Sequence, residues 1–273
     1  MQANSPLKVA VMGVGWVGSA VANYFTERGL EPVLFDPPKK LGSPKDLERA
    51  DVMFMCVPTP YDEAAGGFDL AYIKRAIEVI PGNKIIVIKS TVLPGTTEKL
   101  QNQYPRHRFL FNPEFLRQVS ADADFRNPER QIIGTTAASA DLAEQVLALL
   151  PPAPFTRVIA ATEAETVKYF GNCFLALKVV FANQVFDLCR RLGIDYDTVR
   201  ASAAADSRIG SSHLKIAPDG YRGYGGGCFP KDMKAFIQLG DLAGVDLALL
   251  KTCERLNAEL VKIGEPKKAV AAG

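Results

Sequence analysis

The sequence predicts an α/β domain built on a doubly wound parallel sheet, followed by an all-helical domain with one long central helix. Three observations predict this fold class. Short apolar segments alternate with helical patterns over residues 7–160, a glycine turn follows the first of them, and few segments after residue 161 have a strand pattern. We therefore expect domains at residues 1–161 and 162–264, with a tail at residues 265–273.

The expected strands of the first domain are short and apolar. They lie at residues 7–12, 31–35, 51–57, 84–89, 108–111, 131–134 and 157–160, with helical patterns such as residues 141–150 in some of the gaps. Strands that alternate with helices form βαβ units, so we expect a parallel sheet with helices on both faces.

The expected long helix covers residues 163–192, which contain no proline. Apolar residues recur along it at spacings of three and four: Val167, Phe170, Phe174, Leu177, Phe181, Val185, Leu188 and Leu192. At about 1.5 Å per residue such a helix would span more than roughly 40 Å, which is longer than a small domain needs, so we expect a homodimer seam along its apolar stripe. A glycine-rich loop at residues 218–232 and a further helical pattern at residues 233–263 follow.

Composition and charge exclude several classes of function. The 32 basic and 30 acidic residues are mixed along the chain and leave a net charge of +2, so no basic face suggests a nucleic-acid polymer as partner. No apolar run approaches the ~20 residues that a membrane span requires. The polar residues 1–8 lack a signal-peptide core, and we expect a cytoplasmic protein without membrane contact.

The five cysteines are an odd number without a CxxC spacing, which argues against a disulfide framework and against a zinc site, and we expect no metal. Four of them lie in apolar strand or helix patterns and are expected to be buried and inert: Cys56, Cys173, Cys189 and Cys253.

Cys228 has a different context. It follows the glycines at residues 225–227 and stands at the start of a helical pattern, three residues before Lys231. A lysine and a helix N-terminus lower the pKa of a nearby thiol and raise its thiolate fraction. The sequence therefore predicts that Cys228 is a nucleophile for covalent chemistry on a carbonyl.

The glycine turn after the first strand has the residues of a Rossmann-type dinucleotide site. Gly13 permits the tight turn, Gly15 lets the backbone approach a pyrophosphate, and Gly18 permits close packing of helix on strand. Asp36 ends the next expected strand, where its carboxylate can bind the adenosine ribose and would repel a 2′-phosphate. The sequence thus predicts NAD rather than NADP, a preference that the two lysines shortly after Asp36 weaken slightly.

Six further segments resemble the UDP-glucose/GDP-mannose dehydrogenase family, in the manner of its UDP-glucose 6-dehydrogenases. They are residues 57–60 (VPTP), 89–92 (KSTV), 112–116 (NPEFL), 165–172 (ETVKYFGN), 206–210 (DSRIG) and 226–232 (GGCFPKD), in the family's order. The match covers nearly the whole chain. It implies a two-step oxidation of a nucleotide-sugar primary alcohol to a carboxylate, with two molecules of NAD.

The resemblance also implies catalytic roles. Cys228 would capture the aldehyde as a thiohemiacetal, whose oxidation gives a thioester. Glu114 would be the general base for hydrolysis of that thioester, with Thr91 and Asp232 holding the water.

Lys168 and Asn172 would stabilise the oxyanion and contact the substrate, since a spacing of four puts them on one face of the long helix. Arg208 would contact the substrate across a dimer interface. The other expected substrate contacts are Phe115, Leu116, Tyr224 and Gly225, and the other expected cofactor contacts are Trp16, Val17, Val57, Pro58, Thr59, Thr91 and Lys231.

Members of this family normally continue into another α/β domain, whereas this chain ends at Gly273. We therefore expect that the C-terminal UDP-binding domain is absent or supplied by a separate chain. Two alternatives stay open. A β-hydroxyacid dehydrogenase shares the plan of a nucleotide-binding domain followed by helices, but it needs no cysteine in a glycine-rich loop. A catalytically idle NAD-binding subunit that needs a partner chain is opposed by the retention of the catalytic residues.

Overall fold

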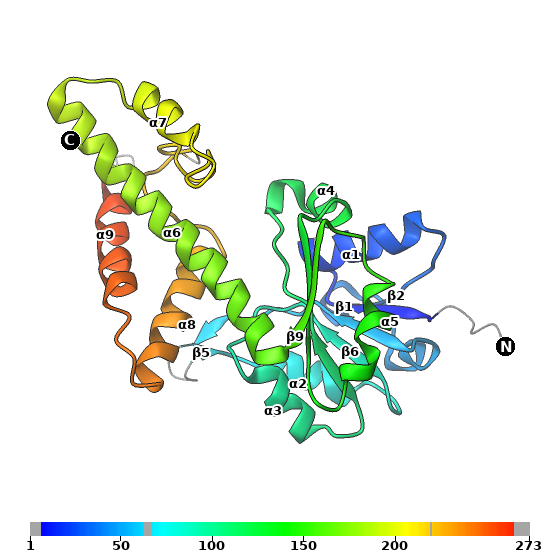
Figure 1. Ribbon diagram of the computed structural model, residues 1–273. Helices are drawn as coiled ribbons and strands as arrows, with labels where there is room; N and C mark the ends of the chain where they lie inside the picture. The colour runs from blue at the N-terminus through cyan, green and yellow to red at the C-terminus, as the bar shows by residue number, and fades with distance from the viewer. Residues whose placement is uncertain (1–6, 63–66, 219, 265–273) are drawn as a thin grey trace, which may run out of the picture. The chain divides into compact units, whose positions relative to one another are not determined.

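The computed structural model describes residues 7–62, 67–218 and 220–264. It divides into two compact units, unit 1 (Met1–Lys168) and unit 2 (Tyr169–Gly273), and the division falls within the helix α6 (Ala161–Leu192) (Figure 1). The sequence prediction put the domain boundary where that helix begins. The predicted tail at residues 265–273 lies outside the described residues.

Unit 1 is built on a sheet whose described strands follow the order β2-β1-β3-β6-β7-β8-β9. Its strands confirm all the predicted ones: β1 (Val9–Met12), β2 (Val33–Phe35), β3 (Val52–Met55), β6 (Ile85–Ile88), β7 (Arg108–Phe111), β8 (Arg130–Thr135) and β9 (Phe155–Ala160). A separate antiparallel pair is formed by β4 (Tyr61–Asp62) and β5 (Gly67–Phe68).

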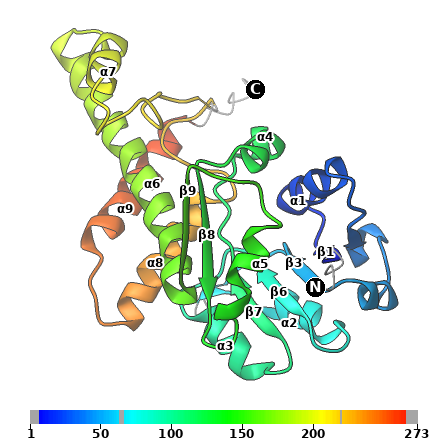
Figure 2. The same cartoon turned by 45° about the vertical axis from the view of Figure 1, so that its right-hand side comes forward.

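Helices cover both faces of this sheet, as the sequence predicts, because successive strand residues point to opposite sides. Met12 and Ile88 belong to one apolar cluster, together with residues of α2 (Ala71–Glu78) and α3 (Thr96–Gln103). Val11 and Val87 belong to the other, together with residues of α1 (Trp16–Glu27), α4 (Ala121–Arg126) and α5 (Ala143–Leu147). Figure 2 shows these two groups of helices around the sheet.

One strand pair differs from the predicted parallel sheet, because β8 runs antiparallel to β7. In the register of this pair Phe111, at the end of β7, lies opposite Gly134, so β8 begins beyond the point where β7 ends. The short helix α4 between them packs on α1 and does not carry the chain back along the sheet. β9 then pairs parallel to β8, and the sheet is mixed at this edge.

Two of the predicted helical stretches are shorter than expected. The segment between β2 and β3 forms two 3-10 helices, η1 (Pro37–Lys39) and η2 (Pro44–Arg49), which are separated by the left-handed residues Lys40 and Gly42, with φ of 56° and 65°. The pattern at residues 141–150 becomes the 3-10 helix η4 (Ala140–Leu142), followed by α5.

Unit 2 contains the rest of α6 and the helices α7 (Tyr196–Ala204), α8 (Phe229–Leu242) and α9 (Ala248–Gly264). Its core joins α6 to α8 and α9, and the Tyr169 ring stacks on Phe236 at a centroid distance of 5.2 Å. The prediction of one helical pattern over residues 233–263 is wrong. Gly244 adopts a left-handed φ of 73° that ends α8, and α8 itself begins inside the predicted loop, with Pro230 near its start.

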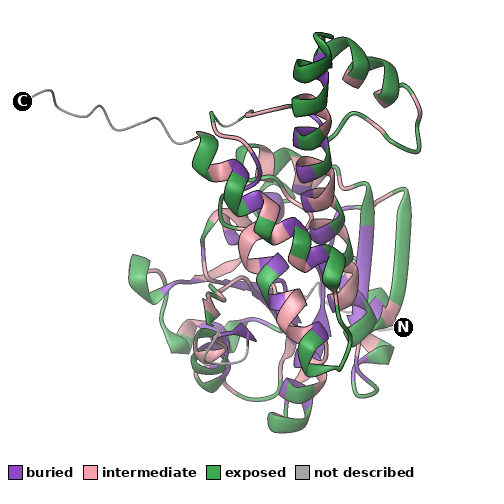
Figure 3. Ribbon diagram, turned by 90° about the vertical axis from the view of Figure 1, so that its left-hand side faces the viewer, coloured by how far each residue is buried: buried purple, intermediate pink, exposed green. Residues whose placement is uncertain are grey.

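The helix α6 is long and apolar enough to cross a membrane by length and composition, with a mean hydropathy of 1.3 over its most apolar window. The sequence-based expectation that no segment is apolar enough to span a membrane is therefore not met by α6. A core or interface helix has the same composition. About a third of that window is buried, and Figure 3 shows buried and exposed residues alternating along the helix.

Candidate functional site

The glycine turn between β1 and α1 has the space that a dinucleotide needs. A Cβ on Gly13, whose φ is +83°, would lie 2.8 Å from the Cys56 carbonyl oxygen, and one on Gly18 would lie 1.9 Å from the Gly13 carbonyl oxygen. A Cβ on Gly15 would meet no described atom within 4 Å. Gly13 and Gly18 thus serve packing, whereas Gly15 leaves open space beside the first turn of α1, which begins with Trp16 and Val17.

Asp36, which directly follows β2, holds this turn in place. Its carboxylate accepts hydrogen bonds from the backbone N–H of Val14 at 2.7 Å and of Lys39 at 3.3 Å, and the residue is only 9% exposed. The Lys39 ammonium in turn donates to the Val14 carbonyl oxygen. Sequence reasoning missed this lysine contact, which ties the 3-10 helix η1 to the glycine turn.

The loops after β3 and β6 lie side by side, as the carboxyl ends of neighbouring parallel strands must. The Thr59 hydroxyl donates to the Thr91 carbonyl oxygen at 2.7 Å, and the Ser90 hydroxyl donates to the Val57 carbonyl oxygen at 2.7 Å. The structure therefore brings the predicted residues Val57, Pro58, Thr59 and Thr91 together at one sheet edge.

Glu114 follows β7 and is bound on both carboxylate oxygens. The Lys168 ammonium donates to Oε1 and to the Glu114 carbonyl oxygen, each at 2.6 Å, and the Leu116 N–H donates to Oε2 at 3.0 Å. Burial raises the pKa of Glu114, but the charge and hydrogen bonds of Lys168, the Leu116 N–H and the charge of Lys89 outweigh it and leave the pKa below its usual range. Glu114 is thus a buried carboxylate.

Phe115, the next predicted residue, is held by a cation. The Arg130 guanidinium lies 3.9 Å from the centre of its ring, and the Lys168 ammonium lies 5.9 Å from it. The ring is therefore fixed beside the Glu114–Lys168 pair.

Glu165 is a further polar residue at the start of α6 that sequence reasoning gave no role. Its buried carboxylate accepts hydrogen bonds from the N–H of Gly95 at 2.6 Å, from the N–H of Thr97 at 2.8 Å and from the Thr97 hydroxyl at 2.6 Å. It therefore caps α3 from a distant helix. The sequence signal that could have indicated a role for Glu165 is its position one helical turn before Lys168, within the family-like segment at residues 165–172.

Cys228 stands at the N-cap of α8, after Gly226 with a φ of +72°, so the predicted junction of glycine loop and helix is confirmed. The thiol is partly exposed, and the described cysteines form no disulfide. Burial raises the pKa of Cys56 and of Cys173 to about 12 and that of Cys253 to about 11, which keeps these thiols protonated.

Asp232 is the centre of a second polar cluster, one helical turn after Cys228. Asn172 donates from Nδ2 to Asp232 Oδ2 at 2.5 Å, and the Lys231 ammonium donates to Oδ1 at 2.7 Å. Asp232 is fully buried. Three predicted site residues therefore meet within unit 2, while Lys231 is engaged with Asp232.

Three predicted substrate contacts lie elsewhere in unit 2. The Arg208 side chain is 88% exposed and paired with Asp206 at 2.5 Å. Tyr224 is 4% exposed, and its hydroxyl lies 3.0 Å from a carboxylate oxygen of Glu254, so its ring belongs to the core. A Cβ on the adjacent Gly225 would lie 2.6 Å from the Tyr221 hydroxyl. Contacts of Arg208, Tyr224 and Gly225 with a substrate stay predictions.

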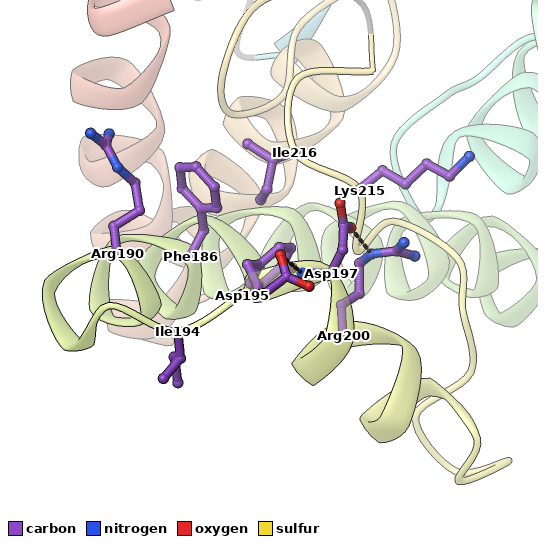
Figure 4. Close-up of a pocket in the computed structure, with 9 residues that line it drawn as sticks. Phe186, Arg190, Ile194, Asp195, Asp197, Arg200, Lys215 and Ile216 are labelled. Carbon is purple, nitrogen blue, oxygen red and sulfur yellow. Dashed lines mark hydrogen bonds and ion pairs between the residues drawn. The ribbon is translucent and has the colours of Figure 1, made fainter.

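A cavity of about 560 Å³ in unit 2 contains none of the predicted site residues (Figure 4). It is lined by Phe186, Arg190, Ile194, Asp195, Tyr196, Asp197, Arg200, Lys215 and Ile216. Asp195 caps α7, and Arg200 pairs with Asp197 at 2.8 Å. These charges are engaged with the protein itself, so we place the candidate site at the two polar clusters and the glycine turn.

Two models of one protein family match the chain. Residues 39–149 match the NAD binding domain of the UDP-glucose/GDP-mannose dehydrogenase family, and residues 162–259 match its central domain. The first match indicates NAD as the cofactor.

Individual relatives agree with these models. UDP-glucose 6-dehydrogenase TuaD of Bacillus subtilis is 33% identical over 92% of this chain, and the match covers 62% of TuaD. A UDP-glucose dehydrogenase structure from Pyrobaculum islandicum is 31% identical over 95% of this chain and 69% of its own, with a TM-score of 0.75. A 3-hydroxyisobutyrate dehydrogenase of Mycobacterium tuberculosis shares the fold, with a TM-score of 0.74 at 16% identity over 95% of both chains. The chain spans less than two thirds of the length of TuaD.

Proposed function

Because this chain belongs to the UDP-glucose/GDP-mannose dehydrogenase family, we propose that it oxidises a nucleotide-sugar primary alcohol to a carboxylate with NAD, in the manner of a UDP-glucose 6-dehydrogenase. The observation that carries the proposal is that α6 directs two polar side chains, one helical turn apart, onto two buried carboxylates. Lys168 on this helix binds Glu114, and Asn172, one turn later, binds Asp232. An inert helix surface would not bury two such polar groups.

The glycine turn and the loops after β3 and β6 would hold the cofactor. The open space at Gly15 and the start of α1 suit the pyrophosphate, and Asp36 stands at the end of the strand that faces the adenosine ribose in such sites. NAD supplies the hydride acceptor for each oxidation. Thr91, held by the neighbouring loop, would complete this edge.

Cys228 would act on the aldehyde that the first oxidation produces. Its sulfur adds to the carbonyl carbon and a proton goes to the carbonyl oxygen, which gives a thiohemiacetal. Loss of a hydride and a proton from this adduct gives a thioester. The N-cap position of Cys228 supports this role, because the end of a helix favours a thiolate.

Glu114 would remove a proton from the water that attacks the thioester carbon, after which the carbon–sulfur bond breaks and the Cys228 thiol is restored. A carboxylate kept ionised by Lys168 suits this task. Lys168 and Asn172 would donate to the oxygen that becomes negative in each tetrahedral state. Asp232 would orient Asn172 through their hydrogen bond.

The direct test is the formation of NADH when the purified chain is given NAD and a panel of UDP- and GDP-sugars. The proposal predicts two NADH per sugar consumed for at least one of them, with release of the acid. A parallel assay with added cell extract shows whether a separate chain is needed for activity.

The same assay separates the proposal from two other functions. A β-hydroxyacid dehydrogenase would form one NADH per hydroxy acid and would not oxidise nucleotide sugars. This alternative is tested because the mycobacterial 3-hydroxyisobutyrate dehydrogenase has the same fold. A catalytically idle NAD-binding subunit would bind NAD and produce no NADH with either class. Cys228, placed at the N-cap of α8 behind a glycine loop, argues against both.

A homodimer through α6 is a second part of the proposal. Five apolar side chains on this helix are at least half exposed in unit 2 and recur at spacings of four and seven: Phe170, Phe174, Phe181, Leu188 and Leu192. A stripe of this kind on a helix marks an interface between helices.

Light scattering at micromolar concentration tests the dimer. The chain should have twice its monomer mass, and Phe181→Glu should reduce it to the monomer because a charge in the seam is not tolerated. Leu249→Glu is the matched control, since Leu249 is equally exposed but lies on α9. A wild-type monomer would sink the proposal.

A cytoplasmic location is consistent with this chemistry. The described cysteines form no disulfide, and a reducing compartment keeps thiols such as that of Cys228 in the free form. Fractionation of the cells that produce the protein tests it.

A further inference from the structure

Lys89 is a buried lysine to which the proposed function assigns no task. It directly follows β6 and is 3% exposed. Its ammonium donates to Asn112 Oδ1 at 2.5 Å and lies 5.3 Å from the centre of the Phe125 ring. Among the described residues no carboxylate lies within ion-pair distance of it. A buried charge without a direct counter-charge is costly, so a purely structural lysine would be a poor choice here.

The hydrogen bond from Lys89 fixes the turn that carries Glu114. Asn112 stands two residues before Glu114, and both the oxygen and the nitrogen of its side-chain amide form hydrogen bonds. Its Nδ2 donates to the Ile132 carbonyl oxygen at 2.8 Å and to Gln131 Oε1 at 3.3 Å, and its Oδ1 accepts from Lys89. Lys89 thereby connects the end of β6 to β8 through this turn, and Asn112 cannot rotate without breaking several bonds.

The charge of Lys89 also acts on Glu114. The charged or titratable groups around the pair come from four elements: Cys56 after β3, Lys89 after β6, Arg130 on β8 over the Phe115 ring, and Lys168 on α6. Burial lowers the pKa of Lys89 to about 8, so its ammonium is still mostly protonated at pH 7. This positive charge lowers the pKa of Glu114 in addition to Lys168.

Lys168 and Lys89 would have different roles in the proposed reaction. In the proposed function Lys168 donates to the oxyanion, and its hydrogen bond to Glu114 weakens at that moment. Lys89 is held by Asn112 and Phe125, and its charge acts on Glu114 without a direct hydrogen bond to it. While Lys168 donates to the oxyanion, a second positive charge that stays in place would keep the buried Glu114 ionised.

We propose that Lys89 is a positioning residue, which fixes the Asn112–Glu114 turn and keeps Glu114 ionised while Lys168 serves the oxyanion. This inference rests on the proposed function for its catalytic meaning. Its physical content, that the charge of Lys89 helps to keep Glu114 ionised in addition to Lys168, can be measured without turnover.

The test compares Lys89→Met and Lys89→Gln with wild type and with Lys84→Met. The Gln amide can still donate to Asn112 but carries no charge, so it separates charge from hydrogen bonding. Lys84 is the matched control, because it precedes the same strand at the opposite end and its ammonium binds the carbonyl oxygens of Glu48 and Ala50.

The readout is the rate of acid release from the Cys228 thioester in single turnovers as a function of pH. Both Lys89 variants should shift the acidic limb upward by about one pH unit, the effect typical of losing one nearby charge. Lys84→Met and Lys89→Arg should keep the wild-type limb. Lys89 variants that are slower at every pH with an unmoved limb would overturn the proposal, because a structural defect alone acts in that way.

A second measurement needs no turnover and only one folded Lys89 variant. The ¹³C resonance of the Glu114 carboxylate, assigned by its absence in Glu114→Gln, is titrated by NMR. The titration midpoint should rise in Lys89→Met or Lys89→Gln and stay in place in Lys84→Met. An unmoved midpoint overturns the inference even if the enzyme is active, whereas a wild type that releases no acid while the midpoint moves contradicts only the proposed function.

Discussion

The surroundings of Glu114 and of Cys228 are built in different ways. Glu114 is 7% exposed and has a donor on each carboxylate oxygen. Cys228 is partly exposed and ends a loop in which Gly220, Gly223 and Gly226 have positive φ. The difference agrees with the proposed chemistry, because a general base must be kept ionised inside the protein whereas a nucleophile must be reached by an aldehyde. Substitutions in the two regions should therefore fail in different ways.

The largest effect is expected at the nucleophile. Cys228→Ser should lower the rate of aldehyde oxidation by about 10³-fold or more, because a serine hydroxyl has too high a pKa to form the adduct without its own base. Oxidation of the alcohol to the aldehyde can survive. NADH yield per sugar and acid production measure both steps. Cys189→Ala, at a buried cysteine, is the control, and undiminished acid production by Cys228→Ser contradicts the account.

The next effect is expected at the partner of the base. Lys168→Met leaves Glu114 buried without its ion pair, so the free energy of unfolding should fall by about 3 kcal/mol and acid release by about 10²-fold. Urea unfolding and single-turnover kinetics measure these changes. Lys178→Met is the matched control, since Lys178 lies on the same helix and is bonded to the Ile209 carbonyl oxygen. If Lys168→Met has wild-type stability and wild-type acid release, the proposed role of the Lys168–Glu114 ion pair is wrong.

Glu165 offers a test that depends on pH. Burial raises its pKa from 4.5 to about 7, so the folded state binds a proton at Glu165 more tightly than the unfolded chain does. The stability from this difference is present below the unfolded pKa and is lost as the pH rises through about 7. Relative to Glu165→Gln, wild type should therefore lose on the order of 2 kcal/mol of unfolding free energy between about pH 4 and about pH 8.

Urea unfolding at both pH values measures that difference. Glu163→Gln is the control, because Glu163 lies on the same turn of α6 but is exposed and accepts a hydrogen bond from the Ala160 N–H. A constant difference between wild type and Glu165→Gln at all pH values would contradict the direction of the pKa shift.

The smallest effect is expected at the cofactor turn, outside both regions. Asp36→Ala removes the acceptor of the Val14 and Lys39 N–H groups, so the affinity for NAD should fall about 10-fold and its preference over NADP should shrink. Calorimetric titration with both dinucleotides measures this. Asp51→Ala, at an exposed carboxylate that accepts a hydrogen bond from the Lys8 N–H, should change neither. Equal affinity of wild type for NAD and NADP would overturn the assignment of Asp36.

Most of the fold of unit 1 is predictable because its signals are local. Short apolar segments gave all the strands of the main sheet, and the spacing of Gly13, Gly15 and Gly18 located the turn. The antiparallel β8 was missed, since strand direction depends on where α4 packs and not on the residues of β8. The break between α8 and α9 was missed although Gly244 marks it.

The candidate site was predictable only in part. Glu114, Cys228 and Asp232 stand in short motifs, but their partners come from distant parts of the chain. The sequence pairs neither Lys168 with Glu114 nor Glu165 with Thr97, since each contact joins residues far apart in the chain. Lys89 lies in the KSTV segment, and the sequence predicts no role for it, because burial of a lysine cannot be read from its neighbours in the chain. The sequence therefore predicts which residues belong to the site, but which of them form pairs is known only from the fold.

The central claim is that Glu114 and Cys228 take part in one covalent reaction. Glu114→Gln keeps the shape of the base but cannot accept the proton of the attacking water, so the thioester should form and be released slowly. With a competent sugar nucleotide or its aldehyde, we predict a burst of NADH and, by mass spectrometry of the intact protein, an acyl adduct on Cys228. A Glu114→Gln protein that turns over NADH without any adduct would contradict the account.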